Sequence, residues 1–253
     1  MIDSHCHLTD PRLASQLDDV LARARANGVT RMLTIGTDLA DARRAIDLCA
    51  RIPAVRCAIG VHPNHCQDVA VSDLPALRTL AADPAVLALG EMGLDYFHHF
   101  APREKQHAVF EFQLQLATEM DRPVVIHSRE AVEDTLAVMA NFPALRAVFH
   151  CFTGTRAQAS RILDRGYFLG FTGPITYKKN DELRQVVKLT PDDRLLVETD
   201  SPYLTPEPMR KQKTNEPGFV HHVARMVAQV KGWTLEYADE VTTGNVERLF
   251  GWP

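Results

Sequence analysis

The sequence lacks several features that would each point to a different class of protein. Its 253 residues include five cysteines, an odd number with no CxxC pair, which excludes a disulfide framework and predicts reduced thiols in a cytoplasmic protein. No apolar run approaches the roughly 18 residues that a transmembrane helix needs, so no membrane association is expected. The first residues, MIDSHCHLTD, contain neither the basic nor the apolar region of a signal peptide.

An excess of positive charge is also absent. Lys and Arg number 28 against 32 Asp and Glu, which gives a net charge of −4. A broad nucleic-acid-coating surface is normally basic, so this balance argues against one, although it allows a small basic patch beside an active site. Hydrophobic residues make up 45% of the chain and charged residues 24%, which is typical of a globular protein with a buried core.

The chain shows no internal repeat, low-complexity tract or flexible linker. Its length alone fits either one domain or two, because α/β barrels commonly reach 200–250 residues as one domain. The proline-rich stretch SPYLTPEPMRK is interpreted as a long loop and not as a linker. We therefore expect a single domain over residues 1–253.

Short β-rich runs alternate with segments of helical periodicity along the whole chain. The runs expected as strands are residues 2–8, 30–36, 55–61, 86–90, 123–127, 146–150, 167–171 and 194–200. Strand–helix alternation with short loops implies parallel strands, and eight such units indicate an α/β protein with a (β/α)8 TIM-barrel-like fold. The alternative is a doubly wound open sheet, but the glycine-rich turn that such a sheet often carries after its first strand is missing.

Polar side chains stand where the predicted strands end. His5 and His7 alternate along the first strand and therefore point to the same face. Glu91, His127 and His150 each follow a different apolar run. Asp200 follows another. In a (β/α)8 barrel the carboxyl ends of the strands build the active site, and so many polar groups crowded there are best explained by a bound metal.

Six ligands exceed one tetrahedral set and point to a binuclear centre. One ion is assigned the ligands His5, His7, Glu91 and Asp200. The other is assigned Glu91, His127 and His150, so that Glu91 bridges the two ions. Imidazole and carboxylate donors suit Zn²⁺, Mn²⁺ or Mg²⁺, and the sequence does not choose among these cofactors.

Further residues near the strand ends are candidates for substrate contacts. His62 ends the third strand and is expected to contact the substrate and to assist the leaving group as a proton donor. Arg129 has two readings, as a phosphate ligand or as the salt-bridge partner of Glu198 or Glu130. Lys178 and Arg210 lie in the loops after the last two strands, where (β/α)8 proteins often bind phosphate, and are expected to form a basic rim.

Six short motifs follow one another along the chain: DSHCHL, GVHP, GEMGLDY, PVVIHSREA, HCFTG and VETDSPYL. Each motif alone is weak evidence, but the ordered set is specific to one known family. The sequence from Ile2 to about Phe250 resembles the TatD family of metal-dependent hydrolases, within the wider amidohydrolase-like group. The resemblance implies a barrel, a binuclear site and divalent-metal-dependent DNase activity, often 3′→5′ exonucleolytic. The family's metal ligands match the six residues assigned above without a substitution.

Three functions remain open on the sequence. The first is a deoxyribonuclease-like phosphodiesterase that attacks DNA or other nucleic-acid ends with a metal-activated water, with Asp200 as general base, Glu91 as bridging ligand and His62 beside the leaving oxygen. The second is an ester or amide hydrolase with the same site, such as a D-aminoacyl-tRNA deacylase. The third is a non-enzymatic binding protein, which the intact ligand set disfavours. No obligate protein partner is indicated.

Overall fold

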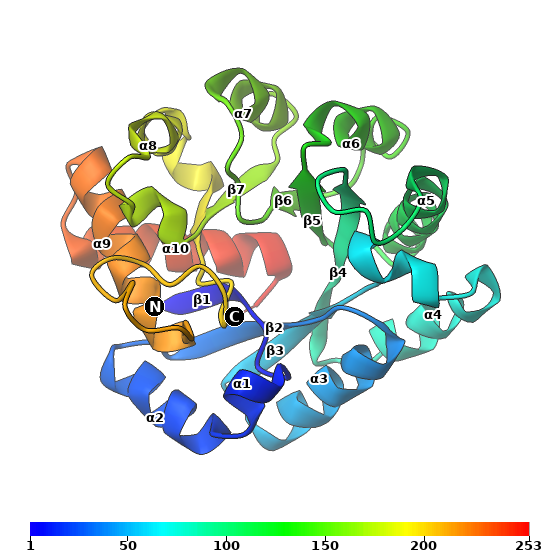
Figure 1. Ribbon diagram of the computed structural model, residues 1–253, viewed down its shortest axis with the longest axis horizontal. Coiled ribbons are helices and arrows are strands. Elements are labelled where there is room, and N and C mark those ends of the chain that lie inside the picture. Colours follow the sequence, from blue (N-terminus) through cyan, green and yellow to red (C-terminus); the bar gives the residue numbers. More distant parts are fainter. Residues whose placement is uncertain (253) are drawn as a thin grey trace. The chain divides into compact units, whose positions relative to one another are not determined.

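The computed structural model describes residues 1–252, which form eight strands and ten α-helices in alternation (Figure 1). The strands are β1 (Ile2–Cys6), β2 (Arg31–Gly36), β3 (Val55–Ile59), β4 (Val86–Asp95), β5 (Val124–Arg129), β6 (Ala147–Phe149), β7 (Phe168–Phe171) and β8 (Leu195–Val197). The helices are α1 (Pro11–Ala14), α2 (Leu17–Ala26), α3 (Leu39–Arg51), α4 (Ala76–Ala81), α5 (Arg103–Glu119), α6 (Val132–Met139), α7 (Arg156–Leu163), α8 (Asp181–Leu189), α9 (Val220–Lys231) and α10 (Leu235–Phe250). Within this part of the chain, no helix has the length and apolar character needed to cross a membrane.

The strands form one sheet in which spatial order equals chain order, β1 through β8. The described strand pairs are parallel. This topology, with a helical segment between successive strands, confirms the predicted (β/α)8 fold. The chain divides into two compact units, one built from residues 1–34 and from residue 151 onward, the other from residues 35–150. The single domain expected over residues 1–253 stays a prediction.

In the first unit, the last strand returns beside the first. The hydroxyl of Ser4 donates to the carbonyl of Val197 at 3.0 Å, and Cys6 forms a parallel bridge with Ser201. The backbone continues this pairing beyond both strands, because the N–H of His7 donates to the carbonyl of Ser201 at 2.8 Å. These contacts of β1 with the end of β8 and the residues after it are the connection that a (β/α)8 topology requires, and they bring the residues after β8 beside the histidines of β1.

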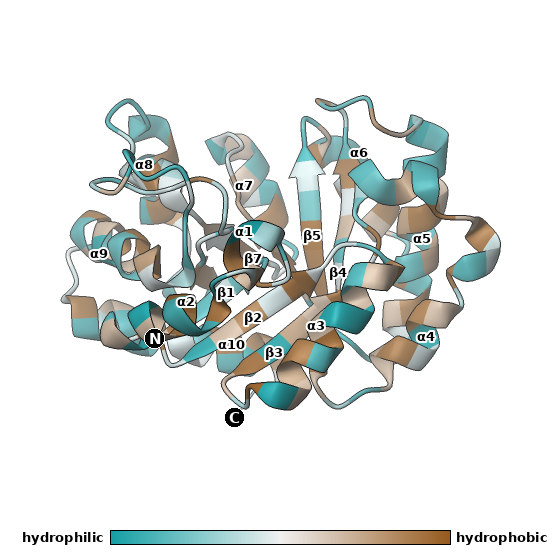
Figure 2. Ribbon diagram, turned by 60° about the horizontal axis from the view of Figure 1, so that its bottom comes forward, coloured by the Kyte–Doolittle hydropathy of each residue, from teal (hydrophilic) through white to brown (hydrophobic). Residues whose placement is uncertain are grey.

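In the second unit, β4 and β5 run longer than the sequence predicted. Their register pairs Leu89 with Val124 and ends with Asp95 opposite Arg129. Figure 2 shows β5 changing from brown at its start to pale and teal at its tip, as its apolar residues give way to polar ones. Glu91 and His127 therefore lie within strands and not after them. The hydrogen bonds between β4 and β5 therefore fix the backbone positions of both residues.

Two glycines provide a test of this register. A Cβ placed on Gly93 would lie 2.0 Å from the carbonyl oxygen of His127, and Gly93 has a φ of +143°. We expect Gly93→Ala to lower the free energy of unfolding by about 3 kcal/mol or more, because both the backbone conformation and the neighbouring strand oppose a side chain. Urea denaturation followed by circular dichroism measures the change.

Gly244 in α10 is the matched control, because a Cβ there meets no atom within 4 Å. Alanine is the better helix former by about 1 kcal/mol, so Gly244→Ala should leave stability unchanged or raise it slightly. Equal stability of the Gly93 and Gly244 variants would show that the β4–β5 register is wrong.

Candidate metal centre

A cluster of two histidines and one aspartate, called here the Asp200 cluster, lies in the first unit. His5 and His7 come from β1 and its end, and Asp200 follows β8. Asp200 Oδ1 lies 3.2 Å from His7 Nε2 and 3.7 Å from His5 Nε2. One ligand atom from each of the three lies within 4.8 Å of the others, which is compatible with all three binding one cation. The prediction that His5 and His7 share a face agrees with this geometry.

The backbone after β8 holds Asp200 in place. Asp200 has a φ of +54°, and its N–H donates to the carbonyl of His5 at 2.9 Å. The side chain of Asn215 supports the same loop, donating to the carbonyl of Thr199 at 2.9 Å. Because β8 ends at Val197, Glu198 and Asp200 lie beyond the strand and strand alternation does not relate their side chains. Glu198 is buried and accepts a hydrogen bond from the backbone N–H of Cys151.

Asp3 is a residue of this region that the sequence analysis missed. It is completely buried in β1 and accepts hydrogen bonds from both the N–H and the hydroxyl of Thr199, at 2.9 and 2.5 Å. Burial raises the pKa of Asp3 to about 8, although the hydrogen bonds from Thr199 act in the opposite direction. Asp3, His5 and His7 occur at every second position, and this alternation was the available signal.

The second unit contains a carboxylate surrounded by three imidazoles, called here the Glu91 cluster. Glu91 Oε1 lies 2.6 Å from His150 Nε2, 2.7 Å from His127 Nδ1 and 3.3 Å from His62 Nε2. Burial alone would raise the pKa of Glu91, but the surrounding imidazoles of His150, His62 and His127 lower it well below its usual range. Glu91 is therefore a carboxylate whose charge is matched by nitrogen donors.

Both ring nitrogens of His127 meet carboxylates. Its Nδ1 faces Glu91, and its Nε2 lies 3.1 Å from Asp95 Oδ2. Burial would lower the pKa of His127, but the hydrogen bonds to Asp95 and Glu91 raise it. Histidines that bind metals commonly donate the other ring nitrogen to a carboxylate, which fixes the tautomer and the ring orientation. Asp95 provides this second contact and leaves Nδ1 as the nitrogen for a cation.

Asp95 also shapes the backbone of the loop that follows β4. Its Oδ1 accepts from the N–H groups of Phe97 and His98, at 3.0 and 2.8 Å. Its Oδ2 lies 2.9 Å from His98 Nδ1. Although burial opposes ionisation, the hydrogen bonds from His127 and His98 lower the pKa of Asp95. One carboxylate therefore connects the loop after β4 with His127.

His62 lies beside His127, as expected for a residue at the end of the third strand. Its Nδ1 accepts a hydrogen bond from the N–H of Asn64 at 3.0 Å, which places the proton of the neutral ring on Nε2. Nε2 lies 3.2 Å from His127 Nδ1. Burial lowers the pKa of His62 to about 4, partly offset by Glu91, so the ring is neutral near pH 7. His62, Glu91 and His127 themselves form a candidate cation site, a role that the sequence analysis did not assign to His62.

Arg129 is exposed, and its guanidinium lies over the Phe97 ring at 4.7 Å. It forms no ion pair among residues 1–252, so the salt bridge to Glu198 or Glu130 is not formed there, and its role as a phosphate ligand stays a prediction. In the first unit, Lys178 is exposed and the guanidinium of Arg210 lies over the ring of Tyr177 at 3.8 Å. The two loops that carry Lys178 and Arg210 contact each other, since the N–H of Glu207 donates to the Thr176 hydroxyl at 2.8 Å.

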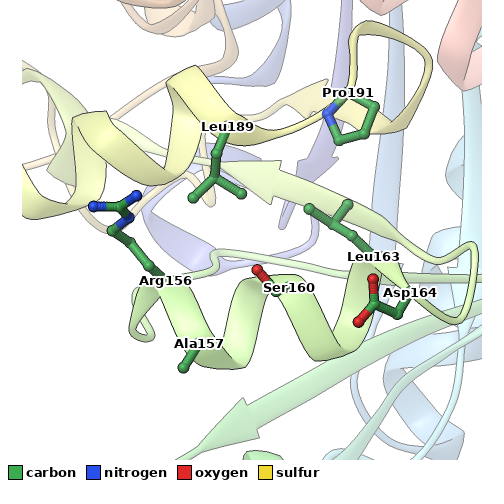
Figure 3. A pocket seen from close by; sticks show the side chains of 7 residues that line it. All are labelled: Arg156, Ala157, Ser160, Leu163, Asp164, Leu189 and Pro191. Atoms are coloured by element: carbon green, nitrogen blue, oxygen red, sulfur yellow. The ribbon is translucent and has the colours of Figure 1, made fainter.

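A surface pocket lies elsewhere in the first unit, between α7 and the end of α8 (Figure 3). Its lining residues are Arg156, Ala157, Ser160, Leu163, Asp164, Leu189 and Pro191. None of the predicted ligands or substrate-contact residues lines it. The concentration of imidazoles and carboxylates in the Asp200 and Glu91 clusters locates the chemistry better than this pocket does.

The donor atoms of both clusters fit divalent cations. Each combines imidazole nitrogens with a carboxylate, the set that suits Zn²⁺, Mn²⁺ and Mg²⁺, and no cysteine takes part. A (β/α)8 fold that carries such clusters on its strand ends defines a metal-dependent hydrolase. The chain belongs to the TatD family, since the family model described as "TatD related DNase" matches residues 2–251.

Relatives along the whole chain agree with this membership. The chain is 40% identical over 255 residues to the "Uncharacterized metal-dependent hydrolase YcfH" of Escherichia coli K12, covering 99% of this chain and 95% of the relative. It is 39% identical over 259 residues to the "3'-5' ssDNA/RNA exonuclease TatD" of Erwinia amylovora, covering 99% and 100%. The crystal structure of YJJV, a TatD homolog from E. coli K12, superposes with a TM-score of 0.94 at 28% identity, covering 100% and 98%.

Proposed function

We propose that the protein is a divalent-metal-dependent phosphodiesterase that shortens single-stranded nucleic acid from its 3′ end, and that two ions, Mg²⁺, Mn²⁺ or Zn²⁺, occupy its site. The observation that carries the proposal is the convergence of three imidazole nitrogens on one oxygen of Glu91. The relative named as a 3′–5′ ssDNA/RNA exonuclease supports it, because it is similar over the full chain.

In this proposal the two clusters belong to one binuclear centre. Its ligands are His5, His7 and Asp200 from the first unit and Glu91, His127 and His150 from the second, with Glu91 as the bridge. The fold class supports the assignment, since active sites of (β/α)8 proteins are assembled from the carboxyl ends of several strands. Bound cations would lower the pKa of a water molecule and offset charge on the phosphoryl oxygens.

The chain's own residues have distinct tasks in the reaction. Asp200 accepts the proton of the attacking water. Neutral His62 presents its Nε2–H as a hydrogen-bond donor to the leaving oxygen. Asp95 keeps the His127 ring oriented, and Arg129 contacts a substrate phosphate through its planar guanidinium. A reducing, cytoplasmic location is part of the proposal and rests on the odd number of cysteines and the absence of CxxC pairs in the sequence.

A 5′-labelled single strand of DNA tests the proposal. Metal-stripped protein is supplied in turn with Mg²⁺, Mn²⁺ or Zn²⁺, and the products are separated by length. We expect a ladder that shortens from the 3′ end with at least one metal. An intact strand under all three metals would reject the nuclease and move the hypothesis to carbonyl chemistry, with hydrolysis of D-aminoacyl-tRNA as the next assay.

The basic rim of Lys178 and Arg210 predicts a salt-dependent contribution to binding. We expect Lys178→Ala and Arg210→Ala each to weaken binding of single-stranded DNA and to reduce the slope of log K against log salt concentration by roughly 0.7–1. Fluorescence anisotropy between about 50 and 200 mM salt measures this slope. Lys188→Ala is the control, because this lysine is exposed on α8, outside the two loops. Equal slopes for all the variants would remove the rim from the substrate path.

A further inference from the structure

The loop between β4 and α5 exposes an unusual amount of aromatic surface. Phe97 and Phe100 are 49% and 62% exposed, although large apolar side chains at such positions cost free energy in water. His98 connects them, with its ring 4.8 Å from that of Phe97 and stacked 5.5 Å from that of Phe100. The three rings, called here the aromatic platform, form a continuous surface within the second unit.

A cation lies on the same platform. The guanidinium of Arg129 lies 4.7 Å from the centre of the Phe97 ring, and Arg129 is paired with Asp95 in the β4–β5 register. It has no carboxylate partner within residues 1–252. An exposed aromatic surface with an adjacent unneutralised arginine is complementary to a nucleotide, which offers a planar base and a negatively charged phosphate.

The platform is connected to the Glu91 cluster through Asp95. This one carboxylate accepts from the backbone of Phe97 and His98 and also holds Nε2 of His127. Along β5, Arg129 lies two residues beyond His127, a displacement of roughly 7 Å at the strand rise. A base on the platform would therefore belong to a nucleotide close to the phosphate at the Glu91 cluster.

We propose that the aromatic platform stacks an unpaired nucleobase of the substrate while Arg129 contacts a phosphate of the same strand. The inference rests on the proposed nuclease function and deepens it. It makes an unstacked single strand the preferred substrate and predicts little base preference, because every base has a face for stacking. A duplex end would first have to lose its own stacking.

Two oligonucleotides of equal length and charge test the platform. One is an ordinary single strand, and the other carries abasic residues at its last two 3′ positions. For the natural protein we expect kcat/KM to be at least about 5- to 150-fold higher on the strand with bases, the range expected for one stacked base. In the Phe97→Ala/Phe100→Ala double variant this ratio should fall toward one.

Two further variants serve as controls. Phe97→Trp keeps an aromatic face and should preserve the preference for bases. Tyr237→Ala removes an exposed aromatic side chain from α10 and should leave the ratio as it is in the natural protein. A binding measurement independent of turnover uses 2-aminopurine near the 3′ end of a strand with hydrolysis-resistant phosphorothioate linkages. Its fluorescence should be quenched by the natural protein and not by the double alanine variant.

The outcomes separate the platform from the nuclease. Cleavage of DNA with an unchanged ratio and unchanged quenching in the double variant would overturn the platform and leave the nuclease standing; the aromatic surface would then serve a protein partner. Quenching that depends on Phe97 and Phe100 without any cleavage would support the platform as a binding site and reject the nuclease. Absence of both cleavage and quenching would overturn both.

Discussion

Replacing Glu91 with glutamine is expected to reduce hydrolysis at least about 1,000-fold, a loss of roughly 4 kcal/mol in transition-state stabilisation. One oxygen of Glu91 is the common neighbour of His62, His127 and His150. The amide keeps the size of the side chain but removes the negative charge that these nitrogens and the bound cations need. Initial rates of 3′ trimming measure the loss, and elemental analysis of the purified protein should show fewer than two ions per chain.

The control for this substitution is Glu111→Gln, which removes a carboxylate from an exposed position on α5. It should retain both the activity and the metal content of the natural protein. Circular dichroism at low temperature is expected to show the same helical content for both variants, so that a loss of activity is not a loss of fold. Full activity of Glu91→Gln would show that Glu91 does not bridge the ions.

The sequence predicted the fold and most residues of the two clusters. Buried parallel strands are apolar runs, and a histidine or carboxylate at the end of such a run is conspicuous. His127 after Val124-Val125-Ile126 is an example. The regular alternation of strand and helix supplied the rest, because parallel strands in chain order leave few topologies open.

Strand ends were predicted less well, because hydrogen bonding between strands does not stop where apolar residues stop. β4 continues to Asp95, where the side chain of Gln106 accepts from the Asp95 N–H at 2.8 Å and donates to its carbonyl at 3.0 Å. This partner lies eleven residues away in a helix. No local sequence pattern predicts such a contact. For the same reason the sequence did not predict the contact between Asp95 Oδ2 and His127 Nε2.

The opposite error occurs at β8, which ends three residues earlier than expected. Asp200 adopts a left-handed backbone conformation and Glu198 turns to the backbone of Cys151, so the period-two rule that works for His5 and His7 fails there. Alternation is a property of extended backbone alone. For residues that follow the end of a strand, such as Asp200, the sequence therefore does not predict in which direction the side chain points.

Removal of divalent metal is expected to abolish hydrolysis and to lower the melting temperature by about 10–20 °C. A ligand that binds only the folded state at 100 times its Kd contributes about 2.7 kcal/mol, so two ions contribute about 5 kcal/mol. For a chain of this size each kcal/mol corresponds to roughly 2–4 °C. Chelation, removal of the chelator and stepwise return of Mg²⁺, Mn²⁺ or Zn²⁺ should restore activity and melting temperature together.

Substitution of a single predicted ligand then tests which cluster binds which of the two ions. Asp200→Asn weakens only the Asp200 cluster, so about half of the metal-dependent rise in melting temperature should remain, because the Glu91 cluster keeps its donors. Asp47→Asn, an exposed carboxylate on α3, should keep the whole rise. Differential scanning calorimetry at fixed free metal concentration gives both values. An equal rise in all three proteins, or full activity after chelation, would contradict a binuclear centre with Asp200 as a ligand.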